Sequence, residues 1–222
     1  NIYHCVCVSE VDGTVYAGSY NPTYGLYKLT NTSVWEAQPG DADQPTERLA
    51  GNGNNGVFID GYPGQSQIAV VLNIQSRGEM LVGTQVTATS KCIWQLDVPS
   101  QLLTQYACDC STVGSFGGTP VDGVNNTARC YRPYGLAWNA DRTVLYVQER
   151  DGWIRRVTSA NGAAGGETTM TTVTPKAIGS SFHGIVVHPH YSNVTFSASR
   201  GTNQLVVRLN HSDLHSTMIA TN

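Results

Sequence analysis

Cysteine is the residue type in this chain whose spacing says most about its chemistry. The six cysteines are Cys5, Cys7, Cys92, Cys108, Cys110 and Cys130. One residue separates the members of each close pair, whereas paired zinc ligands usually have at least two residues between them. A one-residue spacing places both side chains on one face of an extended strand, where neighbours seldom bond to each other. The set therefore predicts three disulfide bonds in an oxidising compartment and no metal site.

The spacing leaves the pairing of these cysteines open. We expect Cys92 to bond to Cys108 across adjacent strands, and Cys110 to bond to Cys130 and so close the loop between them. Cys5 and Cys7 then remain, either to pair with each other under strain or to reach another chain.

Four Asn-x-Ser/Thr sequons are spread over the whole length of the chain. They begin at Asn31, Asn125, Asn193 and Asn210. Such a sequon is an acceptor for N-linked glycans when it lies on the surface of a secreted protein. We therefore predict N-glycosylation at these four positions and, together with the disulfides, an extracellular or cell-surface location.

Histidines offer the strongest hint of an enzyme. His188-Pro189-His190 places two imidazoles on one side of an extended segment, with His183 a few residues upstream. A zinc site would need a further ligand from elsewhere in the fold, so we interpret these histidines as turn or surface residues. The chain has no Gly-x-Ser-x-Gly elbow, no His-Glu-x-x-His helix and no papain-like cysteine context, and its carboxylates are dispersed. The sequence therefore nominates no catalytic residue, metal or cofactor, and we predict that the protein is not an enzyme.

Composition narrows the choice of partner. The 222 residues have a formal net charge of -3, and only 13% of them are charged. Acidic and basic residues are scattered without a basic stripe, which argues against nucleic acid and anionic membranes as partners. No stretch approaches the roughly 18 apolar residues of a membrane-spanning helix, so we predict no membrane insertion. Because the first residue is Asn1 and not Met, we expect the chain to be a processed or excised piece.

The elements that would position these residues form a repeating unit, which is clearest between residues 133 and 174. Short apolar or alternating runs at 135–138, 144–147, 153–157 and 168–173 are typical of β-strands, and Asp151-Gly152 is typical of a tight hairpin. The same order recurs three more times. The expected strands are 5–8, 14–18, 24–29 and 33–37 in the first unit, 67–71, 79–83, 92–96 and 102–107 in the second, and 183–187, 193–197, 204–209 and 216–220 in the last.

Four successive four-stranded units predict an all-β chain that forms one β-propeller domain, residues 1–222. The predicted antiparallel blades are residues 3–40, 66–108, 133–174 and 182–221, with long inter-blade loops at 41–65 and 109–132. A β-sandwich is the alternative, since it also has short alternating strands.

At these residues the sequence resembles the NHL-repeat family of β-propellers. The resemblance is strongest over residues 47–158 and lies in Arg48-Leu49-Ala50-Gly51-Asn52-Gly53 followed by Asp60-Gly61, in Phe116-Gly117-Gly118 followed by Asp122-Gly123, and in Arg132-Pro133-Tyr134-Gly135-Leu136-Ala137 with 145–147 and 153–157. It implies a ring-shaped scaffold of the kind that binds proteins, nucleic acids or glycans, and a minority of related propellers are metal-dependent lyases or lactonases. The family usually has about six blades, and this chain supplies four. Either the ring closes with four unusually long blades, or these blades belong to a longer polypeptide, or open sheet edges meet another subunit.

Three functions are compatible with these observations. The preferred one is a secreted or cell-surface glycoprotein that acts as a structural or assembly module, for example a subunit of an extracellular fibre or surface coat. It would associate with itself or with other extracellular proteins through blade edges and loops, because an uncovered sheet edge can pair with a further chain. The first alternative is a ligand-binding or protein-binding ectodomain of a cell-surface receptor. The second is a metal-dependent propeller lyase or hydrolase.

Overall fold

The computed structural model describes residues 2–20, 24–29, 46–54, 56–88, 90–110, 119–160, 166–174, 182–191, 193–199, 205–212 and 215–221. In these ranges the chain is all-β apart from one short 3-10 helix, η2 (Asn125–Thr127). Among the described residues no helix has the length and apolar character needed to cross a membrane.

The strands form four separate antiparallel sheets, and apart from one short strand of the third sheet they follow one another in chain order. The first sheet contains β1 (Ile2–Val8), β2 (Val15–Tyr20), β3 (Tyr24–Leu29) and β4 (Thr46–Gly53). The second contains β5 (Val71–Arg77), β6 (Met80–Val86), β7 (Lys91–Asp97) and β8 (Leu102–Ala107). The third contains β10 (Pro133–Trp138), β11 (Val144–Glu149), β12 (Ile154–Ser159) and β13 (Thr168–Thr174), with β9 (Gly123–Val124) added beside β13. The fourth contains β14 (Phe182–Val187), β15 (Val194–Ser199), β16 (Leu205–Asn210) and β17 (His215–Thr221). The predicted all-β class and the four units of four antiparallel strands are confirmed, and the two-sheet sandwich is not observed.

Local turn chemistry explains why the strands reverse where they do. Between β10 and β11, the amide N–H of Val144 donates to Asn139 Oδ1 at 2.9 Å, and the amide N–H of Thr143 donates to Asp141 Oδ1 at 3.1 Å. Asparagine and aspartate favour turns because their side chains bond the backbone in this way. At the hairpin after β11, Gly152 has φ of 92°, a left-handed conformation that glycine adopts without strain.

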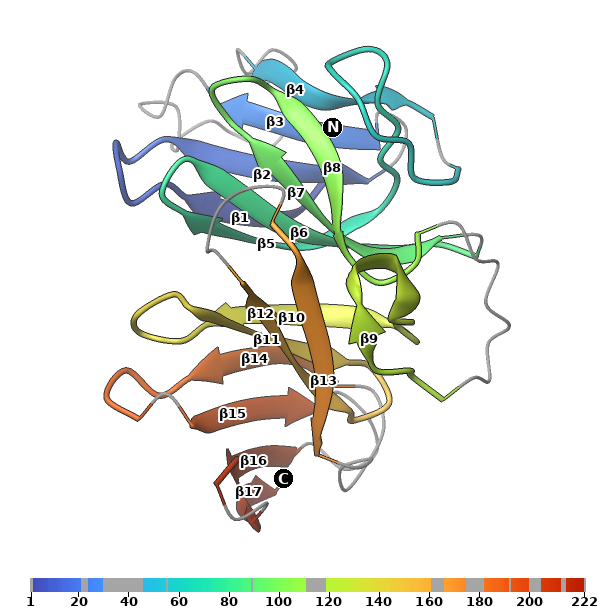
Figure 1. The fold of residues 1–222 in the computed structure, drawn as a ribbon. Coiled ribbons are helices and arrows are strands. Elements are labelled where there is room, and N and C mark those ends of the chain that lie inside the picture. Colours follow the sequence, from blue (N-terminus) through green and yellow to red (C-terminus); the bar gives the residue numbers. More distant parts are fainter. Residues whose placement is uncertain are drawn as a thin grey trace.

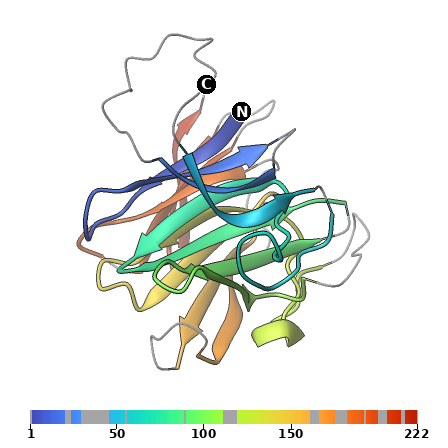
Figure 2. The same ribbon diagram turned by 90° about the horizontal axis from the view of Figure 1, so that it is seen from above.

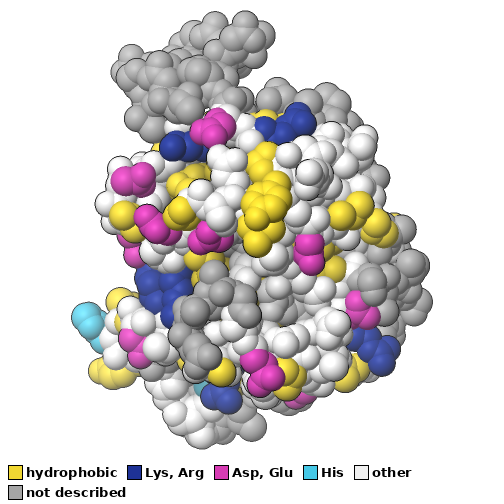
Figure 3. Space-filling model, turned by 45° about the horizontal axis from the view of Figure 1, so that its top comes forward, with side chains coloured by type: hydrophobic (Ala, Val, Ile, Leu, Met, Phe, Trp, Pro, Cys, Tyr) yellow, Lys and Arg dark blue, Asp and Glu magenta, His cyan; other side chains and the backbone are white. Residues whose placement is uncertain are grey.

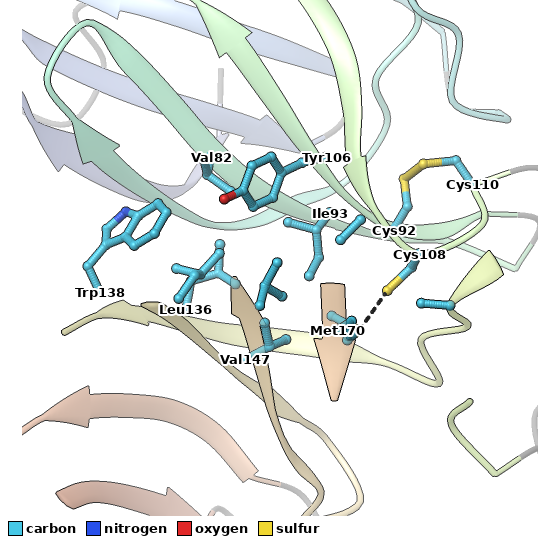
Figure 4. Close-up of a cluster of buried hydrophobic side chains, with 14 of the residues drawn as sticks. Val82, Cys92, Ile93, Tyr106, Cys108, Cys110, Leu136, Trp138, Val147 and Met170 are labelled. Carbon is cyan, nitrogen blue, oxygen red and sulfur yellow. Dashed lines mark hydrogen bonds between the residues drawn. A yellow bond between two sulfur atoms is a disulfide. The ribbon is translucent and has the colours of Figure 1, made fainter. Parts of the chain in front are cut away.

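The sheets are stacked one after another, with a hydrophobic cluster at each junction (Figure 1). The first two sheets bury a cluster that includes Leu26, Ile74 and Trp94. The second and third bury the cluster shown in Figure 4, which includes Ile93 and Leu136. The third and fourth bury a smaller one. Among the described residues no core cluster joins the fourth sheet to the first, and the two lie at opposite ends of the stack in Figure 1.

Two strand predictions are wrong. The fourth strand of the first sheet is β4, which lies inside the predicted loop 41–65, and the predicted strand 33–37 lies outside the described residues. The first strand of the second sheet is β5 instead of residues 67–71, because the chain enters the sheet only at Val71. Ile68 and Ala69 are fully buried in the connection before β5, so their apolar character reflects burial without strand pairing.

The predicted loop 109–132 is also partly ordered as sheet and helix. It supplies β9 and η2, and Val124 and Gly123 pair with Thr169 and Met170 of β13. Viewed from above, this segment lies at the outer margin of the stack (Figure 2). The third sheet therefore gains a fifth, very short strand that the sequence pattern did not indicate.

Candidate functional site

Two disulfides link the second sheet, and the residues directly after it, to the segment that leads into the third sheet. Cys92 of β7 bonds to Cys110, with Cα atoms 4.9 Å apart, and Cys108 bonds to Cys130, with Cα atoms 5.5 Å apart. The predicted pairing of Cys92 with Cys108 and of Cys110 with Cys130 is therefore wrong. Cys108 has φ of 67°, so the chain is not an extended strand there and the two sulfurs of the Cys108/Cys110 pair do not share one sheet face. Two disulfides indicate that the protein folds in an oxidising environment.

The sulfur atoms of the second bond lie in the core between the second and third sheets. Cys108 Sγ is 3.4 Å from Met170 Sδ, as Figure 4 shows, and Cys130 Sγ is 3.9 Å from the same sulfur. The disulfide thus joins the apolar cluster directly, as the burial of Cys108 requires.

Cys5 and Cys7 are unbonded and face the second sheet from β1. Burial raises the pKa of the Cys5 thiol to about 12 and also raises the pKa of Cys7. Thiols with raised pKa values are poor nucleophiles at neutral pH because the thiolate is the reactive form. A disulfide to another chain at these positions remains a prediction, and it would require them to leave the surface that they share with the second sheet.

The histidines do not assemble a metal site in the part of the chain that the structure describes. His188 and His190 have ring centroids 5.9 Å apart, but His188 Nδ1 accepts the backbone N–H groups of His190 and Tyr191 at 3.1 and 3.2 Å. His183 lies edge-on against the ring of Tyr134, at 5.0 Å. No three His, Cys, Asp or Glu side chains of the described ranges are grouped closely enough to hold a metal ion.

Three of the four sequon asparagines are described, and Asn31 is not. Asn125 is exposed in η2, where its Oδ1 accepts the amide N–H of Thr168 at 2.7 Å. Asn193 and Asn210 are half-buried and adjacent, because Asn193 Nδ2 donates to Asn210 Oδ1 at 3.1 Å. Glycosylation at all four sites stays a prediction, with Asn125 the most accessible of the three described.

A buried charge network fastens the 119–132 segment to the third sheet, and sequence reasoning missed it. Arg155 of β12 has no exposed surface and donates to Glu149 Oε1 at 3.0 Å and to Asp122 Oδ1 at 3.1 Å. The other carboxylate oxygen of Glu149 accepts the amide N–H groups of Tyr131 and Arg132 at 2.6 and 2.9 Å. Burial raises the pKa of the Glu149 carboxyl group, although Arg155 opposes that change. Both terminal nitrogens of Arg155 bond to Glu149 or to the 119–132 segment, so we assign the network to positioning this loop.

A polar cavity of about 370 Å³ lies between β8 and η2. Its lining carries amides and hydroxyls and no charged group: Gln95, Thr104, Gln105, Tyr106, Asn125, Asn126 and Gly166. Gln95 Nε2 donates to Thr104 Oγ1 at 3.0 Å, while the buried Gln95 Oε1 has no hydrogen-bond partner in the protein. Such a lining suits a neutral, hydroxyl-rich ligand.

Exposed apolar side chains lie on the two end sheets and also in the connections that lead to β5 and β10. Val6 and Val8 project from β1 of the first sheet, and Val186 and Val206 project from β14 and β16 of the fourth. Charges of both signs are scattered among uncharged groups on the face in Figure 3, without a patch of one sign. Apolar contact is therefore the chemistry that these exposed valines offer to a partner.

Comparison with known proteins supports the fold alone. No family model matches the chain, and no curated protein matches it in sequence. Among solved structures 543 chains match, including the crystal structure of TolB from Acinetobacter baumannii, with a TM-score of 0.54 and 11% identity. The match covers 98% of this chain and 43% of TolB, so the chain spans less than half the length of that protein. TolB is a β-propeller, and the likeness therefore places these four sheets among propeller-like arrangements.

Proposed function

We propose that this chain is an extracellular glycoprotein that acts as a structural or assembly module, built from propeller blades of the NHL type. One observation carries the proposal: the first and fourth sheets present exposed valines on strands whose counterparts in the inner sheets are buried. Contiguous apolar patches on a soluble protein mark interaction surfaces, and Val6 and Val8 lie two residues apart on one face of β1. The low fraction of charged residues agrees with a surface that associates.

Two further observations support the extracellular part of the proposal. The disulfides Cys92–Cys110 and Cys108–Cys130 persist in oxidising compartments and are rare in reducing ones. The exposed sequon at Asn125 is accessible for an N-linked glycan. Glycans would also supply the solubility that charge does not.

The test combines assembly state with glycan analysis. The chain secreted from eukaryotic cells is imaged by electron microscopy and sedimented over a concentration series, before and after treatment with peptide N-glycosidase. We expect particles of several copies and a fall in mass on deglycosylation, smaller by one glycan in Asn125→Gln. A monomer at every concentration would contradict the assembly role, and an unchanged mass would contradict the glycoprotein assignment.

A ligand-binding ectodomain is the second candidate, and the cavity between β8 and η2 favours it. Its uncharged lining predicts neutral saccharides as ligands. Titration of neutral oligosaccharides against the chain and against Gln95→Leu separates this role from assembly, because Gln95 contacts neither end sheet. Binding that is lost in the variant would support the second candidate, and the absence of any binding would leave the assembly role.

A further inference from the structure

The cavity between β8 and η2 contains a buried polar atom that the described part of the chain leaves without a partner. Gln95 lines the cavity and is only 4% exposed. Its Nε2 donates to Thr104 Oγ1 at 3.0 Å, whereas its Oε1 accepts no hydrogen bond from the described residues. An unpaired buried acceptor is unfavourable. The cavity therefore favours an occupant that brings a hydrogen-bond donor to Gln95.

A predicted glycosylation acceptor lies at the same cavity. Asn125 lines it and is also exposed, so this residue lies where the cavity meets solvent. Its side chain is held in place, because Asn125 Oδ1 accepts the amide N–H of Thr168 at 2.7 Å and the Thr168 hydroxyl donates to the carbonyl oxygen of Tyr106 at 2.7 Å. An N-linked glycan is attached to the other polar atom of this side chain, Asn125 Nδ2.

The lining matches the chemistry of the first sugar of an N-linked glycan. N-acetylglucosamine is neutral, and its hydroxyl and acetamido groups both donate and accept hydrogen bonds. The lining offers uncharged amides and a hydroxyl group, from Gln95, Thr104, Gln105 and Asn126. The volume of about 370 Å³ is near the lower end of the ~300–1,000 Å³ that is usual for small-molecule sites, which suits a short saccharide.

The covalent link makes even a weak contact effective. A sugar attached to Asn125 is confined beside the cavity, at an effective concentration on the order of millimolar, as for other ligands on short tethers. A free saccharide loses its translational freedom when it binds, whereas an attached sugar has already lost it. The attached sugar therefore has the advantage over a free saccharide of the same chemistry.

We propose that the first N-acetylglucosamine of a glycan on Asn125 lies in the cavity, where one of its hydroxyl or acetamido groups donates to Gln95 Oε1. This inference rests on the proposed glycosylation and gives one glycan a structural role. In the cavity the sugar contacts β8 of the second sheet, while Asn125 belongs to the segment that adds β9 to the third. The glycan thus links the two sheets on the same side of the chain as the disulfides of that segment.

Substitutions at the third position of the sequon separate the glycan from the side chain that bears it. Thr127→Ala removes the sequon and keeps Asn125 with its bond to Thr168, whereas Thr127→Ser keeps the sequon. Both chains are secreted from the same eukaryotic cells, and mass spectrometry of the peptide that contains Asn125 reads its glycan. The probe is N,N′-diacetylchitobiose, the disaccharide at the base of an N-linked glycan, which is titrated into each chain.

We expect Thr127→Ala to bind the disaccharide and Thr127→Ser to bind it at least ~10-fold more weakly, because its own sugar fills the cavity. Adding Gln95→Leu to Thr127→Ala should abolish the binding, since leucine cannot accept a hydrogen bond. The unmodified chain from tunicamycin-treated cells, which has Thr127 and no glycan, should bind as Thr127→Ala does. Ser212→Ala is the matched control, because it removes the sequon at Asn210, which does not line the cavity, and should leave the cavity blocked.

A second measurement locates the sugar directly. With ¹³C in the acetyl groups of the glycans, the acetamido methyl group on Asn125 should show nuclear Overhauser contacts to Gln95 or Thr104 in Thr127→Ser. The absence of these contacts from a chain that carries the glycan would overturn the inference and leave the glycoprotein assignment standing. Equal binding of the disaccharide by both chains would do the same and would show that the cavity takes a free saccharide.

Two further outcomes would also count against it. If the disaccharide bound to neither chain, the cavity would accept no sugar and the inference would be wrong. If Asn125 carried no glycan, the inference would fail together with the glycosylation predicted at this residue. Sedimentation of the same samples reads the assembly role separately, so that part of the proposed function stands or falls by itself.

Discussion

Arg155 is the buried charge that helps to hold the 119–132 segment on the third sheet. Arg155 bonds Glu149, Asp122 and the carbonyl oxygens of Arg129 and Val121. In Arg155→Met the fully buried Glu149 would lose its counter-charge, which typically costs ~3–5 kcal/mol of folding free energy. We expect a loss of this size in urea unfolding.

The neighbouring Arg156 provides the matched control. It is exposed, so Arg156→Met should change the unfolding free energy by less than ~0.5 kcal/mol. If Arg155→Met unfolded at the same urea concentration as the unmodified chain, the network would not hold the segment.

His211 makes stability depend on pH. Its Nε2 is 3.0 Å from Thr195 Oγ1, its ring stacks on Tyr146 at 4.8 Å, and burial lowers its pKa to about 4. The folded state therefore disfavours the proton that an unfolded histidine binds near pH 6.5. Stability should be full above about pH 6.5 and fall as the pH drops toward about 4, by on the order of 1–2 kcal/mol, because solvent partly screens this half-buried ring and reduces what the full shift would give. Thermal melts across this range, with ionic strength held constant, measure the change.

His211→Gln should flatten this part of the pH profile while it preserves the sequon at Asn210. His190→Gln is the control, because His190 is exposed and its replacement should leave the profile as it was. An unchanged slope in His211→Gln would assign the pH dependence to other groups.

At the scale of elements, the sequence pattern predicted most strands, either from alternation, as in β13, or from short apolar runs, as in β6 and β10, which are buried on both faces. The prediction failed where a segment is buried without pairing in a sheet, or pairs in a sheet without an apolar pattern. Ile68 and Ala69 are apolar because they are buried, although they do not belong to a strand. The β4 strand ends in Gly51-Asn52-Gly53, a sequence typical of a loop, and was therefore predicted as one. Its eight residues join the sheet through pairing with β3, a long-range contact that local pattern does not encode.

The disulfide connectivity depended on one backbone conformation. Spacing predicted an extended 108–110 segment, but the left-handed φ of Cys108 turns the chain there and exchanges the partners. Peptide mapping after proteolysis without reduction should find Cys92 linked to Cys110 and Cys108 linked to Cys130. The opposite linkage would show that the segment is extended after all.

Loss of the Cys108–Cys130 disulfide should lower the free energy of unfolding. The Cys108–Cys130 bond closes a loop with a sequence separation of 22, and a loop of that size constrains the unfolded chain by about 3 kcal/mol. The paired variant Cys108→Ala/Cys130→Ala should therefore unfold at a lower urea concentration by about that free energy. Cys7→Ala, which breaks no bond, is the control, and an equal loss in both would assign the effect to packing alone.

For the whole molecule, the sequence predicted four units but not how the last meets the first. Whether the sheets close into a ring depends on the angle between neighbouring sheets, added up over the three junctions. The side chains packed at each junction determine that angle, and the sequence pattern does not show how they pack. Leu136 is buried and Val6 is exposed, although both are apolar residues in the first strand of a sheet, and the sequence pattern does not distinguish them.

The apolar character of the exposed valines on β1 and β14 predicts how assembly responds to salt. Val6, Val8 and Val186 carry no charge, so association through them should be driven by removal of apolar surface from water. Raising NaCl from about 0.1 M to about 1 M shortens the screening distance from about 10 Å to about 3 Å and weakens exposed ion pairs. We expect the association constant from sedimentation to stay level or rise over this range. A fall of ~10-fold or more would mean that charged groups hold the copies together, and would direct the search for the contact away from β1 and β14.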